Sequence, residues 1–336
     1  MKEIANENNL NKENVKKAGR MHRFLHSRPF KYICLGLSAI VVGAGVGLGM
    51  GFGLKPARVQ TIADGASYAV NELYMKEAKA LYDGAKESGT PLNEALTPDQ
   101  MVNLAYSFYS EKESAKAVGV GSSKAMGIVD QEIQSCSIKE GDKYFEESNS
   151  IGMVKIYNRM YEEGDTTTTY WGSDSDYVSH PEDAMTNEEY AELMGRTVST
   201  PLSYIVSPKT VREGETLSGM EPTGAKKNED GTYTVYIELD VKDSNGSKVM
   251  PGVSNYQKQM KQISGLSGYP NFEYCHLTFL FSEDLLPIEF TNDEKYEAAM
   301  GIINATCIGT MTTYYLDGEA AIPSLSEKID YSAYHA

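Results

Sequence analysis

Residues 229–248, EDGTYTVYIELDVKDSNGSK, show the clearest secondary-structure pattern in the chain. Apolar side chains occupy every second position of this stretch, which is the period of a β-strand with one buried face. They are Tyr233, Val235, Ile237, Leu239 and Val241. Asp-Gly at 230–231 and Asn-Gly at 245–246 bound the run, and both dipeptides favour tight hairpin turns. The stretch therefore predicts an antiparallel strand between two turns.

The same alternation recurs through most of the chain after residue 123, with Gly or Gly-Asp pairs between several of the runs. We expect strands at 125–138, 142–149, 153–162, 166–172, 201–207, 272–282, 286–290 and 302–316. Two short helices interrupt them, one at 186–195 with Thr186 as its cap and Glu189 at the third helical position, and one at 253–264. Short turns between such strands are typical of an antiparallel sheet.

Helical periodicity precedes the strands. Residues 59–88 carry apolar side chains at three- and four-residue steps. In the sequence TPDQ, Thr97 can cap a second helix, Pro98 suits its first turn and Gln100 can complete a capping box. Helices followed by strands predict an α+β fold, with a helical layer packed on a curved, mostly antiparallel sheet. We expect a helical segment at 55–122, a sheet domain at 123–320 and a C-terminal tail at 321–336.

The order of these elements resembles that of a known superfamily. A helix that starts with Thr-Pro-Asp-Gln is followed by GIVDQEIQSCSIKEGDKYFEESNS (127–150), MVKIYNRMYEEGDTTTTYWG (153–172) and a closing run that ends in GTMTTYYLDG (309–318). This order is similar to that of the LolA/LppX-like lipoprotein carriers. The resemblance covers 97–316 and implies a curved antiparallel half-barrel that wraps a helical lid around an apolar cavity. The chain lacks a lipobox and has an acidic insertion at 174–197, so no functional residue is carried over.

An uncharged run near the N-terminus predicts where the domain resides. Residues 32–54, YICLGLSAIVVGAGVGLGMGFGL, form a segment of 23 residues that is long enough to span a bilayer. Residues 1–31 carry eight Lys/Arg against three Asp/Glu, whereas the chain as a whole has a net charge of −16. Basic flanks stay on the cytoplasmic side, so we expect a cytoplasmic tail, a single-pass signal-anchor and an extracytoplasmic region at 55–336. A cleaved signal peptide fits less well, because no small-x-small site follows the run.

Glycines inside this anchor suggest a packing face. Gly43, Gly47 and Gly51 lie four residues apart, and such rows let two membrane helices approach closely. The alternative is an anchor that merely tolerates glycine, which is frequent in membrane helices. A dinucleotide-binding loop is excluded because no strand precedes the glycines and no polar helix follows them.

Motifs for chemistry are few. Asp174, Asp176 and Glu182 are candidate oxygen ligands for Ca²⁺, with a solvated acidic loop as the commoner alternative. We expect no cofactor, because no phosphate-binding or nucleophile motif is present. The acidic outer region also disfavours nucleic acid as a partner.

Cysteine and histidine leave open alternatives. Alternation places Cys275 and Cys307 toward the core, where they could form a disulfide with each other or with Cys136, or remain buried thiols. It places His276 on a partly exposed outer face. A hydrolase would require His180 or His276 to lie beside a carboxylate in a cleft.

Tyrosine dominates the aromatic residues, with 23 Tyr against nine Phe and one Trp. Tyr157, Tyr161, Trp171 and Tyr315 are candidates for a ligand-binding surface, and cross-strand pairs that only stabilise the sheet are the alternative. The sequence therefore favours a membrane-anchored, extracytoplasmic, non-catalytic binding protein for an apolar or amphipathic ligand, such as a lipid, or for a protein partner. The alternatives are an assembly subunit that docks through its glycine-rich anchor and, third, an extracytoplasmic hydrolase.

Overall fold

The structure, a computed structural model, describes residues 72–125, 129–152, 155–173, 176–187, 189, 206, 208, 210–241, 270–300, 303–318 and 320–334. The expected membrane helix at 32–54, the helix at 253–264 and the turn at 245–246 lie outside these ranges. Within the described ranges, none of the helices combines the length and the apolar character needed to cross a bilayer.

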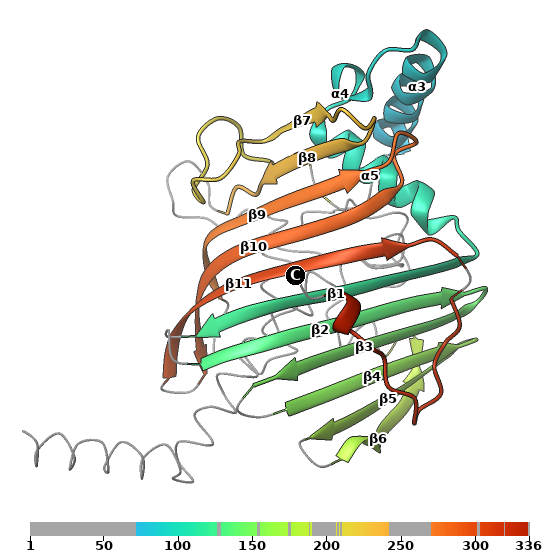
Figure 1. Cartoon of the computed structure of the whole chain (residues 1–336), viewed down its shortest axis with the longest axis vertical. Coiled ribbons are helices and arrows are strands. Elements are labelled where there is room, and N and C mark those ends of the chain that lie inside the picture. Colours follow the sequence, from blue (N-terminus) through green and yellow to red (C-terminus); the bar gives the residue numbers. More distant parts are fainter. Residues whose placement is uncertain are drawn as a thin grey trace, which may run out of the picture.

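The described strands form one eleven-stranded antiparallel sheet in the order β6-β5-β4-β3-β2-β1-β11-β10-β9-β8-β7 (Figure 1). Two meanders, β1 to β6 and β7 to β11, meet where β1 pairs with β11. The strands are β1 (Ser114–Ala125), β2 (Val129–Glu140), β3 (Lys143–Ile151), β4 (Lys155–Glu163), β5 (Thr166–Ser173), β6 (Asp176–Thr186), β7 (Gly224–Lys227), β8 (Tyr233–Glu238), β9 (Asn271–Phe281), β10 (Pro287–Met300) and β11 (Ile303–Leu316).

The Asp-Gly turn at 230–231 forms the hairpin that its sequence predicts. Lys227 of β7 pairs with Tyr233 of β8, and Gly231 has a φ of +90°. That angle favours glycine, because a Cβ clashes with the backbone in this conformation. Val235 and Ile237 are fully buried, as the alternation predicts.

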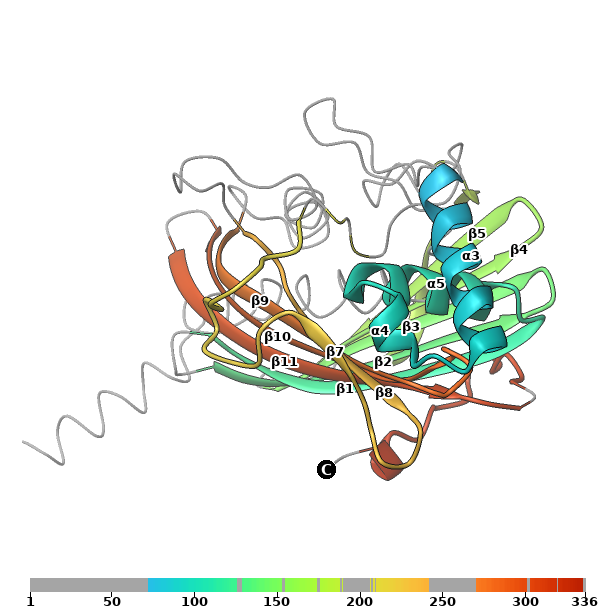
Figure 2. The same cartoon turned by 90° about the horizontal axis from the view of Figure 1, so that it is seen from above.

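Three helices cover part of the concave face of the sheet (Figure 2). They are α3 (Glu72–Ser88), α4 (Leu92–Ala95) and α5 (Pro98–Ser110). The predicted start of α5 is confirmed, since the Gln100 side chain accepts a hydrogen bond of 3.0 Å from the Thr97 N–H. Tyr106 of α5 packs edge-on against Phe279 and Tyr315, with ring centroids 6.2 and 5.7 Å apart. The described region is thus an α+β fold in which helices pack on a curved antiparallel sheet.

The sheet is more extensive than the sequence predicts. Strand β1 begins at Ser114, ahead of the expected boundary at 123, and β6 occupies part of the acidic stretch at 174–197. Small residues on β1 and charged residues on β6 hide the apolar alternation that marks a strand. Pairing with neighbouring strands, rather than hydrophobicity, places these two segments in the sheet.

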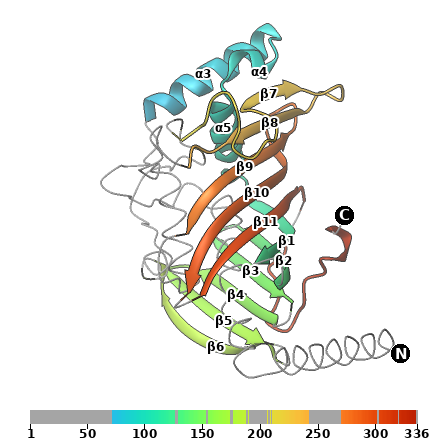
Figure 3. The ribbon, with the colours of Figure 1, turned by 90° about the vertical axis from the view of Figure 1, so that its left-hand side faces the viewer.

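The last described residues pack against the sheet rather than forming a free tail. Residues 320–334, which we call the C-terminal strap, lie on the convex face, opposite the helices (Figures 2 and 3). The strap ends in a short 3₁₀ turn, η2 (Ser332–Tyr334). Its Ala320 and Tyr331 belong to a second apolar cluster with Val118, Val120, Cys136, Ile138 and Phe145 of the sheet.

Close approach of β1 and β11 requires glycine. A Cβ on Gly121 would lie 2.7 Å from the Cα of Met311, and it would also strike the main-chain oxygen of Thr310. Because these obstacles are backbone and cannot rotate away, any side chain at Gly121 must push the two strands apart.

Replacing Gly121 with alanine should therefore destabilise the sheet at its centre. We expect Gly121→Ala to lower the free energy of unfolding by about 1–3 kcal/mol, the usual cost of overpacking. Gly84→Ala is the matched control, since a Cβ there has no neighbour within 4 Å. In helix α3 that change should raise the free energy by up to about 1 kcal/mol. Urea unfolding measures both, and equal effects would contradict the close approach.

Candidate functional site

A row of hydroxyl groups crosses the middle of the concave face. Thr313 of β11, Gly119 of β1, Ser135 of β2 and Ser148 of β3 occupy one cross-strand row. A Cβ on Gly119 would lie 3.2 Å from the Thr313 Oγ1 and would overlap the Ser135 Oγ and the Met311 Cε. The two hydroxyls and the Met311 methyl group therefore converge over the missing side chain. We call Thr313, Ser135 and Ser148 the hydroxyl row.

Two members of the hydroxyl row are buried without a hydrogen-bond partner. Thr313 and Ser148 are 6% and 7% exposed, and neither hydroxyl oxygen has a partner among the described residues. Ser123, 1% exposed on the same face of β1, also has an unpartnered hydroxyl. A buried polar group left unsatisfied costs about 1–3 kcal/mol, and native proteins keep few of them. Three such groups on one face point to a site that another molecule can satisfy.

The surroundings of the hydroxyl row combine apolar and acidic side chains. Met311 and Ile133 lie on the neighbouring cross-strand row and are buried in the main core. Glu294 of β10 faces Gly309, and its Oε2 accepts a hydrogen bond of 3.1 Å from Asn292 Nδ2. Glu146 of β3 accepts a hydrogen bond from the Tyr144 hydroxyl. This face can therefore contact hydrocarbon and donate or accept hydrogen bonds, while its acidic side chains offer no positive charge to an anion.

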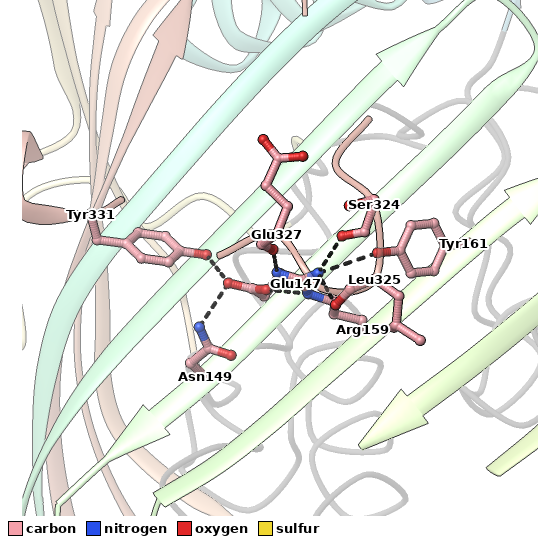
Figure 4. Close-up of polar contacts among 8 residues, drawn as sticks. All are labelled: Glu147, Asn149, Arg159, Tyr161, Ser324, Leu325, Glu327 and Tyr331. Atoms are coloured by element: carbon pink, nitrogen blue, oxygen red, sulfur yellow. Dashed lines mark hydrogen bonds and ion pairs between the residues drawn. The ribbon is translucent and has the colours of Figure 1, made fainter. Parts of the chain in front are cut away.

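The convex face has a different polar centre (Figure 4). The side chains of Arg159 on β4 and Glu147 on β3 are fully buried, and Arg159 Nε donates to Glu147 Oε2 at 2.5 Å. The guanidinium also donates to three main-chain oxygens of the strap: Nη1 to Ser324 and Leu325, both at 3.0 Å, and Nη2 to Glu327 at 2.5 Å. We call this arrangement the Arg159–Glu147 clasp.

Hydrogen bonds also satisfy the carboxylate of the clasp. Glu147 Oε1 accepts from the Tyr331 hydroxyl of the strap and from Asn149 Nδ2, both at 2.8 Å. A buried ion pair is tolerated only when such bonds replace the lost water. Nearby, burial raises the pKa of the Cys136 thiol to about 12, which keeps it protonated at neutral pH. The clasp holds the strap in place and has no feature of a reactive centre.

The aromatic candidates do not meet on one surface. Tyr157 and Tyr161 lie on the convex face, where the Tyr161 hydroxyl accepts a hydrogen bond of 3.3 Å from Arg159. Tyr315 lies on the concave face, where its hydroxyl is 2.6 Å from that of Tyr106 in the core. The side chain of Trp171 is not among those the structure describes. Successive residues of a strand point to opposite faces of the sheet. The curvature of the sheet decides which of the two faces is enclosed.

The candidate metal ligands lie outside the described side chains, as do Gly43, Gly47 and Gly51 of the predicted anchor. This applies to Asp174 and to the side chains of Asp176 and Glu182. Among the side chains that are described, no group of three or more His, Cys, Asp or Glu could hold a metal ion.

The described cysteines are all buried and unpaired. Cys275 and Cys307 lie in the main core, as their alternation predicts, and Cys136 lies beneath the strap on the other face. Of the two alternatives, the structure has buried thiols rather than a disulfide.

His276 is on the expected face of β9, but it is not partly exposed. Only 2% of it is accessible, because residues 211–223 cover it. Its Nε2 lies 2.9 Å from the Glu221 main-chain oxygen, and its Nδ1 has no partner in the described part of the chain. Since neither ring nitrogen bonds a carboxylate, His276 does not meet the condition set for a hydrolase. The side chain of His180 is not described.

Sequence patterns alone did not reveal either polar centre. The hydroxyl row depends on pairing between β1 and β11, whose paired residues are nearly 200 positions apart. The detectable signal is the run SAKAVGVGSSKA of β1, in which small residues occupy every concave position. For the clasp, the signal is a single Arg between Tyr157 and Tyr161 in an otherwise ordinary strand.

Known proteins resemble this chain in structure but not in sequence. No protein-family model matches the chain, and no curated protein matches it. A LolA superfamily protein from Nitrosomonas europaea matches with 9% sequence identity and a TM-score of 0.23. The match covers 68% of this chain and 96% of that chain. It falls in the superfamily whose element order this chain resembles, but so low a TM-score carries no weight for what the chain binds.

Substitution of Thr313 tests whether the hydroxyl row is unsatisfied. Thr313→Val keeps the side-chain shape and removes the unpartnered hydroxyl, so we expect the free energy of unfolding to rise by about 1 kcal/mol. Thr291→Val is the matched control, because its hydroxyl lies 2.9 Å from that of Thr312. Loss of that bond should lower the free energy by about 1 kcal/mol. Urea unfolding decides the matter, and destabilisation by Thr313→Val would show that its hydroxyl is bonded.

Proposed function

We propose that this protein is a non-catalytic binding protein that holds an amphipathic ligand against the concave face of its sheet. The observation that carries the proposal is the hydroxyl row. Thr313 and Ser148 have buried hydroxyls without partners, and Met311 and Ile133 provide apolar contact beside them. Buried hydroxyls without hydrogen bonds lower the stability of the ligand-free protein, and a ligand that bonds them would restore it. Functional sites commonly give up stability in this way.

The chemistry of the face favours a neutral head group. Hydroxyl oxygens both donate and accept hydrogen bonds, so they suit alcohol or amide groups. Glu146 and Glu294 are both almost fully buried on this face, and acidic side chains offer no positive charge to attract an anionic head group. The ligand class is therefore an uncharged amphiphile, such as a lipid with a polyol head.

The convex face is a poorer candidate for the ligand. Its apolar cluster is already covered by the strap, and the charged groups of the clasp are satisfied. Ser135 on the concave face, by contrast, is only half-buried. Access and unmet hydrogen bonds thus coincide on the concave face.

Membrane anchoring is the second part of the proposal, and the sequence supports it. The apolar run at 32–54 follows a basic tail and precedes an acidic region, which favours a cytoplasmic N-terminus and an extracytoplasmic domain. An anchored carrier would stay close to the lipid surface. Glycines at 43, 47 and 51 would allow the alternative role, in which the anchor docks to another membrane helix.

A bulky side chain in the hydroxyl row should block the ligand. We expect Ser135→Phe in the full chain to weaken binding of 1-oleoylglycerol about tenfold, or about 1.4 kcal/mol. Native mass spectrometry of the detergent-solubilised protein measures the bound fraction across a titration.

The matched control for this ligand experiment is Ile308→Phe. Ile308 is 48% exposed, and register places it on the convex face. This control should bind as the unsubstituted chain does. Equal binding by Ser135→Phe and the control, or no binding by the unsubstituted chain, would contradict the proposed concave site.

The topology has its own test. Protease added to intact cells should digest residues 55–336 and spare the tail at 1–31, because the charge asymmetry orients the anchor. Immunoblotting with tags at the two ends measures this. Protection of the C-terminal tag, or a mature protein that lacks residues 1–31, would contradict a retained anchor.

A further inference from the structure

The strap is structurally separable from the sheet. Residues 320–334 contribute no strand to it, and every described strand finds its neighbours without them. The strap follows β11 through Asp317 and Gly318, and Gly318 has a φ of +119°, a turn that favours glycine. Release of the strap would therefore leave the backbone pairing of the sheet unchanged.

The polar contacts between the convex face and the strap are made largely by the strap's main chain. The three strap oxygens that Arg159 contacts, on Ser324, Leu325 and Glu327, are all carbonyls. At the start of the strap, the Ala320 N–H donates to Ser114 Oγ at 3.1 Å. Among the strap side chains, Tyr331 bonds Glu147 through its hydroxyl and lies in the convex cluster, against which Ile322, Ile329 and Tyr334 also pack. The same contacts can form whether the strap belongs to the same chain or to a second copy of it.

Release of the strap would affect the Arg159–Glu147 ion pair and the apolar cluster of the convex face differently. Arg159 and Glu147 would remain paired and become hydrated, so no charge would be left buried alone. Val118, Val120, Ile138 and Phe145 would lose their apolar cover. An exposed apolar patch of this kind favours the binding of another segment that covers it.

We propose that the convex face of β1 to β4 is a docking site for the C-terminal segment, and that the strap of a second copy of this chain can occupy it. Two chains that exchange straps would form two identical clasps, which is the closed arrangement of a symmetric dimer. The exchange needs no new contact, because each clasp repeats the one within a single chain. The tether favours the chain's own strap through its high effective concentration, so exchange grows with protein concentration.

Complementary variants test the exchange with full-length chains. Arg159→Met damages the docking site and leaves the strap intact, whereas Tyr331→Ala damages the strap and leaves the site intact. When differently tagged copies of the two variants are mixed in detergent, one intact strap meets one intact site. We expect this mixed pair to co-purify at least about tenfold more than either variant with itself, since a tenfold change equals about 1.4 kcal/mol.

Association through the glycine-rich anchor is controlled within the same experiment. It would be equal in the mixed and the single-variant samples, because neither substitution touches the anchor. Equal co-purification in all three samples would overturn the proposal. So would co-purification of the mixed pair that survives when both substitutions are placed in both copies.

The cysteines report whether the strap opens without unfolding the domain. Cys136 lies in the cluster beneath the strap, whereas Cys275 and Cys307 lie in the core on the other face. Pulse labelling with N-ethylmaleimide and peptide mass spectrometry distinguishes the sites. We expect Tyr331→Ala to raise labelling of Cys136 at least about tenfold and to leave the other two unchanged, as expected for local opening. Labelling of all three together, or of none, would show that the strap is not separable and would overturn the proposal.

Discussion

The pairing of β1 with β11 is the constraint on which the other features of this structure depend. It joins the two meanders into one sheet over ten residue pairs, from Lys116–Leu316 to Ala125–Cys307. Without side chains at Gly119 and Gly121, the two strands approach closely at the centre. The same pairing sets Thr313 opposite Gly119, beside Ser135, and so assembles the hydroxyl row. It also directs the chain after β11 onto the convex face of the first meander.

The two faces of the sheet differ in how their buried polar groups are satisfied. On the concave face, aromatic packing between α5 and the sheet excludes water near Tyr106, Phe279 and Tyr315. Farther along that face, hydroxyls are buried without partners, so the face keeps unmet hydrogen-bonding capacity. On the convex face, the charged groups of the clasp are paired with each other and hydrogen-bonded. The main core and the unmet hydrogen-bonding capacity therefore share the concave face, whereas the strap and the clasp close the convex face.

Much of the strand content could be predicted because alternation directly reflects burial. Val235 and Ile237 lie inside, and Cys275 and Cys307 point into the core, as their positions indicate. Strand β1 could not be predicted in this way, because Gly119 and Gly121 carry no apolar side chain to reveal a buried face. His276 shows the limit of the method: alternation places it correctly opposite Cys275, but only the folded chain brings residues 211–223 over it.

The sequence by itself determined the α+β class, the start of α5, the Asp-Gly hairpin and which way the side chains of β8 and β9 face. These features depend on neighbours within a few residues, where turn chemistry and periodicity act directly. Tertiary structure alone decided that β1 meets β11, that the hydroxyls of Thr313 and Ser135 converge, and that Arg159 holds the strap. Each of these joins residues separated by more than 150 positions, and strand register, not local preference, selects which side chains meet.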